Sequence, residues 1–130
     1  MRVIFKDLQD EAAEWNGRAL DSEAGLMQVL QNARLLPPFI AELSGEHGYT
    51  LTVGLGGEHG CIQYAASDGS PPYRVALSPD LKTDEIEFMC GGTPTPIAPR
   101  HLLEFDVLSR AVRYFLLTGQ RFPDLLWEEI

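Results

Sequence analysis

The chain contains the side chains that a cysteine hydrolase needs, without a motif that fixes their geometry. His59 and Cys61 stand at i and i+2 in a segment typical of a β-strand, so both side chains would point to one face. Asp68 could orient the histidine, which would complete a set of nucleophile, base and carboxylate. Residues of these three types occur in most chains, so hydrolysis by Cys61 and His59 is kept as an alternative interpretation.

The spacing of the cysteines and histidines disfavours a metal site. Cys90, His47 or His101 could join His59 and Cys61 as ligands, but the chain lacks the paired C-x-x-C or H-x-x-x-H spacing typical of zinc sites. We therefore expect no metal.

The glycine-rich run 54–60 comes nearest to a dinucleotide-binding fingerprint. The third glycine of G-x-G-x-x-G would fall at His59, and a strand follows where a phosphate site needs the start of a helix. A glycine-rich turn between two strands is the better interpretation, and we expect no cofactor.

Charge and composition exclude some partners. The 130 residues are 45% hydrophobic, and 19 acidic against 10 basic residues give a net charge of −9. Binding to a phosphate backbone depends on Lys and Arg displacing counterions, so this balance argues against direct contact with nucleic acid and favours a basic protein as partner. The length predicts a single domain over residues 1–130.

The sequence predicts a cytoplasmic protein. Its first residues lack the apolar region of a signal peptide, and no run approaches the roughly 18 apolar residues of a membrane span, so we expect no membrane association. In a reducing compartment Cys61 and Cys90 are expected to be free, buried thiols.

The first third of the chain predicts a hairpin and a helix. Asn16-Gly17 tolerates positive φ at both positions and indicates a two-residue turn. Asp21 or Ser22 can cap a helix over residues 22–34, which ends before Pro37 because the residue preceding a proline avoids the helical region.

The rest of the chain predicts an antiparallel meander and a second helix. Residues 39–43, 49–55, 61–65, 73–77 and 85–89 favour strands, and Ile86 and Phe88 should share one face. Pro94 and Pro96 are expected to shape a connection. Asp106 and Gly119 should cap the last helix. The economical fold is α+β, an antiparallel sheet of about five to seven strands with two main helices packed on one face and the other face wet.

The best resemblance is to one family. The segments 49–57, 60–64 and 68–73, together with the ending from Thr93 to Ile130, resemble the Imm1 immunity proteins of bacterial polymorphic toxin systems. The resemblance implies a small cytoplasmic α+β protein that binds and neutralises a toxin, often a deaminase or nuclease. It implies no catalytic residue, and it leaves open whether the protein is a monomer or a homodimer. A protein-interaction module without any toxin is the further alternative.

Several exposed residues are candidates for the toxin-binding surface. The loop 68–73 carries Asp68, two prolines that fix φ, and Tyr73, a residue type enriched at interfaces; an ordinary turn is the equal alternative. Toxins that act on DNA or RNA are basic around their active sites, so an acidic partner would be attracted to that charge and would cover the site. The expected toxin-binding residues are Glu58, Asp68, Tyr73, Asp80, Asp84, Glu85 and Glu87.

Overall fold

The fold is α+β, as predicted. The computed structural model describes residues 2–79 and 84–130. Its helices are α1 (Glu23–Ala33), α2 (Phe105–Thr118) and a short 3-10 helix, η1 (Pro99–His101). The strands are β1 (Val3–Asp7), β2 (Ala19–Leu20), β3 (Phe39–Ser44), β4 (Tyr49–Leu55), β5 (His59–Ala66), β6 (Arg74–Ala76), β7 (Ile86–Cys90), β8 (Thr93–Ile97), β9 (Leu103–Glu104) and β10 (Trp127–Glu129).

The main sheet has the strand order β10-β6-β5-β4-β3-β1-β2, with antiparallel pairing between neighbours. β7 joins it through one parallel contact, Phe39 with Met89, and β8 pairs with β7. The described residues form ten strands, more than the five to seven expected. The excess comes from strands of two or three residues, β2, β6, β9 and β10, which are too short to show an alternating pattern.

The predicted helix α1 is confirmed, with Ser22 as its N-cap. The Ser22 hydroxyl accepts a hydrogen bond from the Gly25 amide at 3.1 Å, which satisfies one of the free donors of the first turn. Asn16-Gly17 does form a turn, with the Arg18 amide bonded to the Trp15 carbonyl. β1 and β2 pair antiparallel, so the predicted hairpin is confirmed, but the turn lies inside the longer loop that joins them, so the two-residue connection is wrong.

Helix α2 begins two residues earlier than predicted. Glu104, not Asp106, is the N-cap, and its side chain makes no capping hydrogen bond. Asp106 instead places its carboxylate in the first turn, where negative charge is favourable. Gly119 ends the helix in the left-handed conformation (φ 73°), as predicted.

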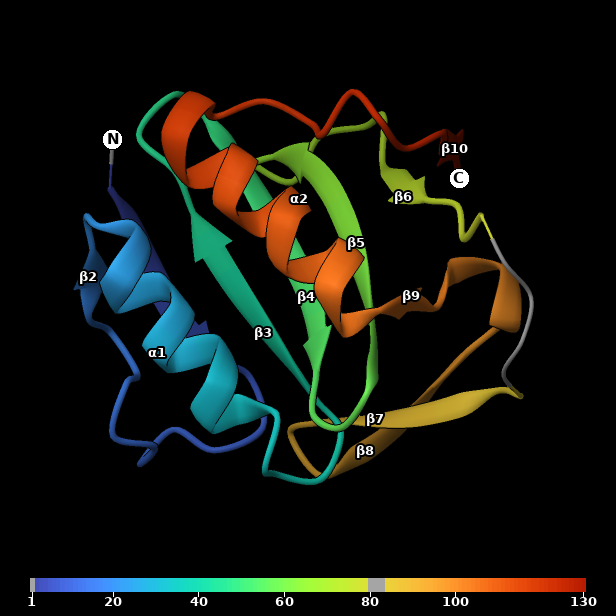
Figure 1. Ribbon diagram of the computed structural model, residues 1–130, viewed down its shortest axis with the longest axis horizontal. Helices are drawn as coiled ribbons and strands as arrows, with labels where there is room; N and C mark the ends of the chain where they lie inside the picture. Colours follow the sequence, from blue (N-terminus) through green and yellow to red (C-terminus); the bar gives the residue numbers. More distant parts are fainter. Residues whose placement is uncertain (1, 80–83) are drawn as a thin grey trace.

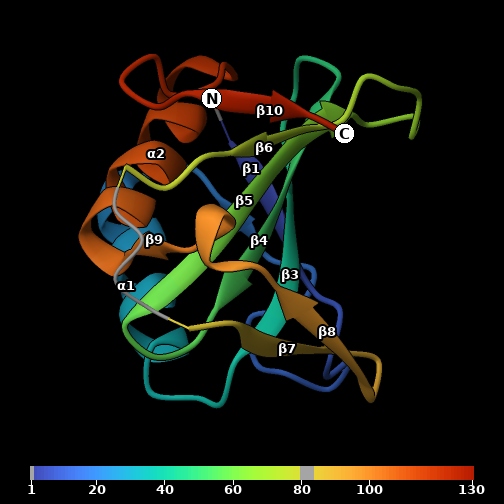
Figure 2. The same cartoon turned by 90° about the vertical axis from the view of Figure 1, so that its right-hand side faces the viewer.

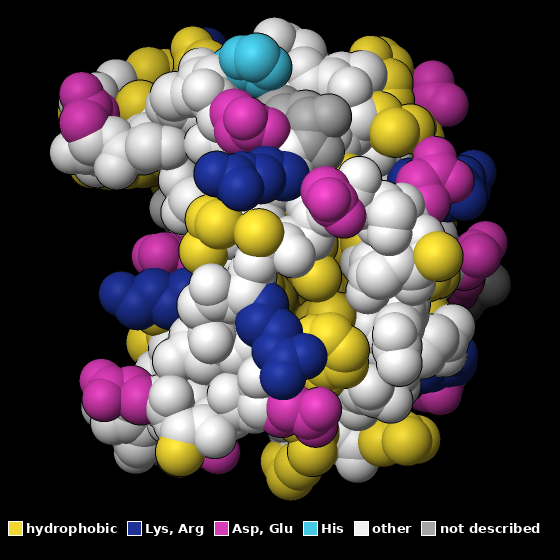
Figure 3. Space-filling view, turned by 90° about the vertical axis from the view of Figure 1, so that its left-hand side faces the viewer, with side chains coloured by type: hydrophobic (Ala, Val, Ile, Leu, Met, Phe, Trp, Pro, Cys, Tyr) yellow, Lys and Arg dark blue, Asp and Glu magenta, His cyan; other side chains and the backbone are white. Residues whose placement is uncertain are grey.

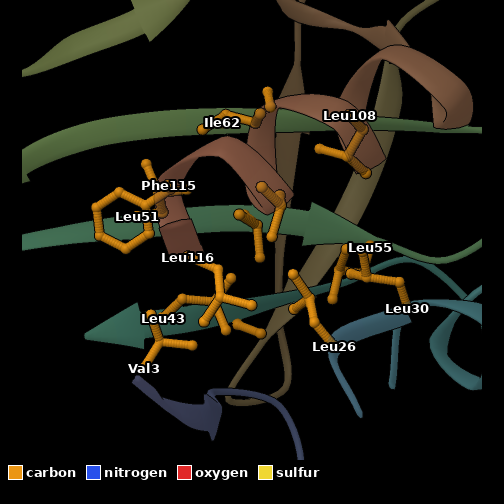
Figure 4. Close-up of a cluster of buried hydrophobic side chains, with 14 of the residues drawn as sticks. Val3, Leu26, Leu30, Leu43, Leu51, Leu55, Ile62, Leu108, Phe115 and Leu116 are labelled. Atoms are coloured by element: carbon orange, nitrogen blue, oxygen red, sulfur yellow. The ribbon is translucent and has the colours of Figure 1, made fainter. Parts of the chain in front are cut away.

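The two helices cover one face of the sheet, crossing in front of the strands in Figure 1. Leu108, Phe115 and Leu116 of α2 point toward the leucines of β3 and β4 (Figure 4). These side chains are at most 2% exposed, so this layer is a continuous core. The prediction of two helices on one face is confirmed.

The opposite face is partly covered, which corrects the prediction that it is wet. Figure 2 shows the β7–β8 hairpin on the side of the sheet away from the helices. Phe88 is fully buried there against Ile40 and Leu102, and Ile86 packs at the edge of the same cluster. Ile86 and Phe88 therefore share one face, as their alternation predicted, but that face lies on the main sheet.

The segment Thr93–Ile97 is strand β8, where a connection was expected. Pro94 and Pro96 pair with Met89 and Glu87 of β7. A proline cannot donate a backbone hydrogen bond, and it is tolerated in a strand that has a partner on one side only. Among the described strands β8 pairs only with β7, so the two prolines stand at an edge.

Gly54 and Gly60 are required by close packing. A Cβ on Gly54 would lie 2.8 Å from the Phe88 ring, and one on Gly60 would lie 2.2 Å from the Gly54 carbonyl oxygen. These glycines therefore allow close contact with neighbouring groups. The run itself forms a turn between β4 and β5, in agreement with the turn interpretation.

Candidate functional site

The predicted toxin-binding residues fall into separate parts of the structure. Glu58 lies just before β5, whereas Asp68 and Tyr73 lie in the loop beyond its other end. β5 has eight residues, so these groups are roughly 25 Å apart. Asp84, Glu85 and Glu87 form a third group at the start of β7, and Asp80 lies outside the described residues.

The loop 68–73 is organised by its own hydrogen bonds. The Asp68 carboxylate accepts bonds from the Ser70 hydroxyl at 2.6 Å and the Ser70 amide at 2.9 Å. The hydroxyl bond is the main reason that the pKa of Asp68 lies below its ordinary value. The Tyr73 hydroxyl donates to the Gly69 carbonyl. These contacts hold the turn together through its own hydrogen bonds and favour the ionised form of the exposed Asp68.

Asp84, Glu85 and Glu87 are exposed. Glu87 stands opposite Pro96 of β8, on the strand whose Phe88 points inward. None of these three carboxylates has an ion-pair or hydrogen-bond partner in the described ranges, so their charge is available to a partner.

The largest of the described pockets lies between α1 and the start of α2, and we name it the α1–α2 pocket. It has a volume of about 540 Å³. Arg34, the C-cap of α1, lies in its wall, where its guanidinium pairs with Glu58 at 2.6 Å and lies 4.4 Å from the Phe105 ring centroid. Its lining residues are Met27, Gln31, Arg34, Glu58, His59, Glu104, Phe105, Asp106 and Ser109.

Two carboxylates of this pocket have no partner. Glu104 and Asp106 are both exposed, and their carboxylates form no ion pair or hydrogen bond with any described residue. The Ser109 hydroxyl is buried at the same pocket and is also unpartnered. The sequence alone pointed to Glu58 but missed these three, because Glu104 and Asp106 resemble ordinary helix-start residues and are far from Glu58 in the chain.

A second pocket, of about 310 Å³, lies on the opposite face of the sheet under the β7–β8 hairpin. It is lined by Cys61, Cys90 and His101 among mainly apolar groups, and we name it the sheet-face pocket. His59 lines the α1–α2 pocket instead, so the structure does not bring His59 and Cys61 into one pocket. Burial raises the pKa of the Cys61 thiol from 9.0 to about 12, which disfavours the thiolate that a nucleophile needs.

The cysteines are unpaired, as expected. Cys61 is buried and Cys90 is half-buried. Within the described residues, no three His, Cys, Asp or Glu side chains are grouped in a way that could hold a metal ion.

At the edge of the sheet-face pocket, the His101 ring interacts with the Glu128 carboxylate. The His101 Nε2 atom lies 2.8 Å from Glu128 Oε1, and Arg100 Nε lies 3.4 Å from the same oxygen. The hydrogen bond with His101 is the main reason that the pKa of Glu128 lies below its ordinary value, and Arg100 adds to it.

This shift predicts a contribution to acid stability. A carboxyl with a lowered folded-state pKa stabilises the fold above its unfolded pKa, and the contribution is lost as pH falls through the folded pKa. Between about pH 5 and about pH 3, we expect the melting temperature of Glu128→Gln to fall less than that of the wild type. Glu129→Gln is the control, because the Glu129 carboxylate is exposed and forms no ion pair with a residue that the structure describes. If the melting temperatures of the wild type and Glu128→Gln fell equally over this pH range, the result would contradict this role of the His101 contact.

The surface carries charges of both signs. Figure 3 shows the side with α1, β1 and β2, where Lys and Arg side chains stand beside Asp and Glu side chains, with hydrophobic groups between them. The net charge of −9 is therefore not gathered into one acidic area on this side.

Comparison with known proteins identifies the family. No helix of the described residues combines the length and apolar character of a membrane span. The search of curated proteins gives no match. The family model described as immunity protein Imm1 matches residues 9–129, nearly the whole chain, including both helices and every strand except β1. The chain therefore belongs to the Imm1 family of immunity proteins.

Proposed function

We propose that this protein, acting as a single domain over residues 1–130 in the cytoplasm, binds and neutralises a basic toxin that acts on nucleic acid. The observation that carries the proposal is the match to the Imm1 immunity family over residues 9–129. The toxin would be a deaminase or nuclease, as the resemblance implies. The immunity protein would block the toxin by covering its active site.

Charge supports this choice of partner. The chain has a net charge of −9. Glu87 in β7, and Asp84 and Glu85 just before it, present carboxylates that have no partner among the described residues. Opposite net charges accelerate association by long-range attraction, and carboxylates can occupy the place of substrate phosphates. An interface of about 1,600 Å² in total would be of ordinary size.

The direct test uses the toxin encoded beside the gene of this chain. We expect co-expression of the protein to restore growth of cells that produce the toxin, and the purified pair to form a complex by size-exclusion chromatography. Absence of both rescue and complex formation would refute the proposed function. Turnover of a small substrate by the purified protein, lost on Cys61→Ala without loss of folding, would also refute it.

The same pair tests steering by the β7 carboxylates. Reversing Asp84, Glu85 and Glu87 to lysine should slow association about tenfold at low salt and flatten its salt dependence. Reversing Glu11, Glu14 and Glu23, which are exposed on another part of the chain, is the control for net charge alone. Equal rates for the two triple variants would show that only net charge matters.

A further inference from the structure

The α1–α2 pocket combines three features that suit one kind of ligand. Its unpaired carboxylates Glu104 and Asp106 give it negative charge that no described side chain neutralises, because the ion pair of Arg34 is made with Glu58. This charge lies at the rim of a hollow with room for a side chain. A ligand that complements this negative charge must be a cation.

Arg34 shows that the walls already suit a guanidinium. Its Nη2 atom is 2.6 Å from a Glu58 carboxylate oxygen, and its Cζ atom is 4.4 Å from the Phe105 ring centroid. A planar cation held by a carboxylate and an aromatic face is the usual arrangement for arginine recognition. The contact also fixes Glu58 and Phe105, so the pocket wall is formed before any partner arrives.

Ser109 is the independent sign of a missing ligand. Ser109 is only 7% exposed, and its hydroxyl oxygen has no hydrogen-bond partner among the described residues. Buried polar atoms nearly always have a partner, and an unsatisfied one calls for a specific explanation. The five donors of a guanidinium could supply a bond to this oxygen as well as to the two free carboxylates.

The first turn of α2 does not favour an anion here. The free amides at a helix start attract negative groups, but Glu104 and Asp106 already provide that charge and would repel an added anion. A bare metal ion is also disfavoured, since no group of described side chains is placed to hold one. The cation that remains is a basic side chain of a protein partner.

Two exposed leucines that follow the pocket residue Arg34 in the chain favour a protein partner. Leu35 and Leu36, which follow Arg34 directly, are 84% and 52% exposed. The Gly57 amide donates to the Arg34 carbonyl at 2.9 Å, which holds this end of α1 against the turn that carries Glu58. Apolar residues next to a charged pocket are typical of a protein interface, where an anchor is surrounded by contacts that exclude water.

We propose that the α1–α2 pocket receives an arginine side chain of the cognate toxin, held by Glu104, Asp106 and Ser109. This rests on the proposed function, because it names part of the surface through which the toxin is bound. The carboxylates of Glu104 and Asp106 would offset the repulsion between this arginine and Arg34, which lines the same pocket. Such an anchor slows dissociation, whereas scattered surface charge changes association.

The test is binding of catalytically inactive toxin from the neighbouring gene to Glu104→Gln/Asp106→Asn, measured by biolayer interferometry. We expect Kd to rise at least about tenfold, mainly through faster dissociation. Glu11→Gln/Glu14→Gln removes the same charge from exposed positions on the β1–β2 loop, and should change Kd less than about threefold. Ser109→Ala should weaken binding severalfold without destabilising the free protein, because it removes a hydroxyl that has no partner.

The outcomes separate the two proposals. If wild-type protein does not bind the toxin, the proposed function fails and the pocket proposal fails with it. If wild-type protein binds and the two double variants have equal dissociation rates, only the pocket proposal is refuted. Circular dichroism melting of each variant verifies that weaker binding is not caused by unfolding.

Discussion

Replacing Phe88 by alanine is expected to lower the free energy of unfolding by about 3–5 kcal/mol, because it removes a fully buried aromatic ring and leaves a cavity. The ring fills the space between the β7–β8 hairpin and the main sheet, against Ile40 and Leu102. Gly54 leaves room for it, since a Cβ there would lie 2.8 Å from the ring. β7 meets β3 at a single residue pair, and the hairpin is otherwise attached by a few hydrogen bonds, such as that from the Met89 amide to the Pro38 carbonyl, so Phe88 is its main apolar anchor.

Urea unfolding followed by tryptophan fluorescence and circular dichroism measures this loss. Glu87→Ala is the matched control, since Glu87 precedes Phe88 on the same strand but is exposed, and should change stability by less than about 0.5 kcal/mol. A loss below about 1 kcal/mol for Phe88→Ala would mean that the hairpin can repack over the gap. The Glu87 carboxylate is carried by the same strand, so Phe88 also fixes part of the proposed steering surface.

The hairpin shows where sequence reasoning succeeds and where it stops. The alternation at 86–88 predicted that Ile86 and Phe88 share a buried face, because a strand repeats every two residues. Nothing in that local pattern says which surface they cover. Phe88 packs on Gly54 and Ile40, which are far away in the chain, so the cover over the second sheet face could not be predicted.

Helix ends were more predictable because their signals are local. Ser22 and Gly119 act within one turn of the backbone they cap, and both positions are confirmed. Strand β8 was missed because Pro94 and Pro96 argue against a strand unless its edge position is already known. Strand β10 has only three residues, and its identity depends on pairing with β6.

The candidate site was only partly predictable for the same reason. Exposed carboxylates such as Glu58 are visible in sequence, but their neighbours are set by the fold. β9 pairs with β5 at His59 and Glu104, and this pairing places the start of α2 beside the β4–β5 turn. Arg34 comes from α1, a third segment. A pocket built from three distant segments has no signature in any one of them.

Cys61 is expected to react with iodoacetamide at pH 8 about a hundredfold more slowly in the folded protein than in the unfolded chain. Burial raises the pKa of its thiol from 9.0 to about 12. The thiolate fraction then falls about a thousandfold, partly offset by the greater nucleophilicity of a more basic thiolate. The side chain is also only 8% exposed, which limits access further.

Mass spectrometry of peptides from timed labelling measures both thiols in one sample. Cys90, half-buried on β7, is the internal comparison and should be labelled faster than Cys61 in the folded protein, while the two rates converge in urea. Equal rates in the folded protein would contradict the buried, protonated state of Cys61. The result bears directly on function, because a cysteine hydrolase must keep its thiolate accessible. The imidazole that shares the Cys61 pocket, His101, is bonded to Glu128, and a Cβ on Gly54 would lie 2.6 Å from the Cys61 sulfur. A slow thiol at this position is therefore a packing residue between sheet and hairpin, and the proposed binding function requires no chemistry from it.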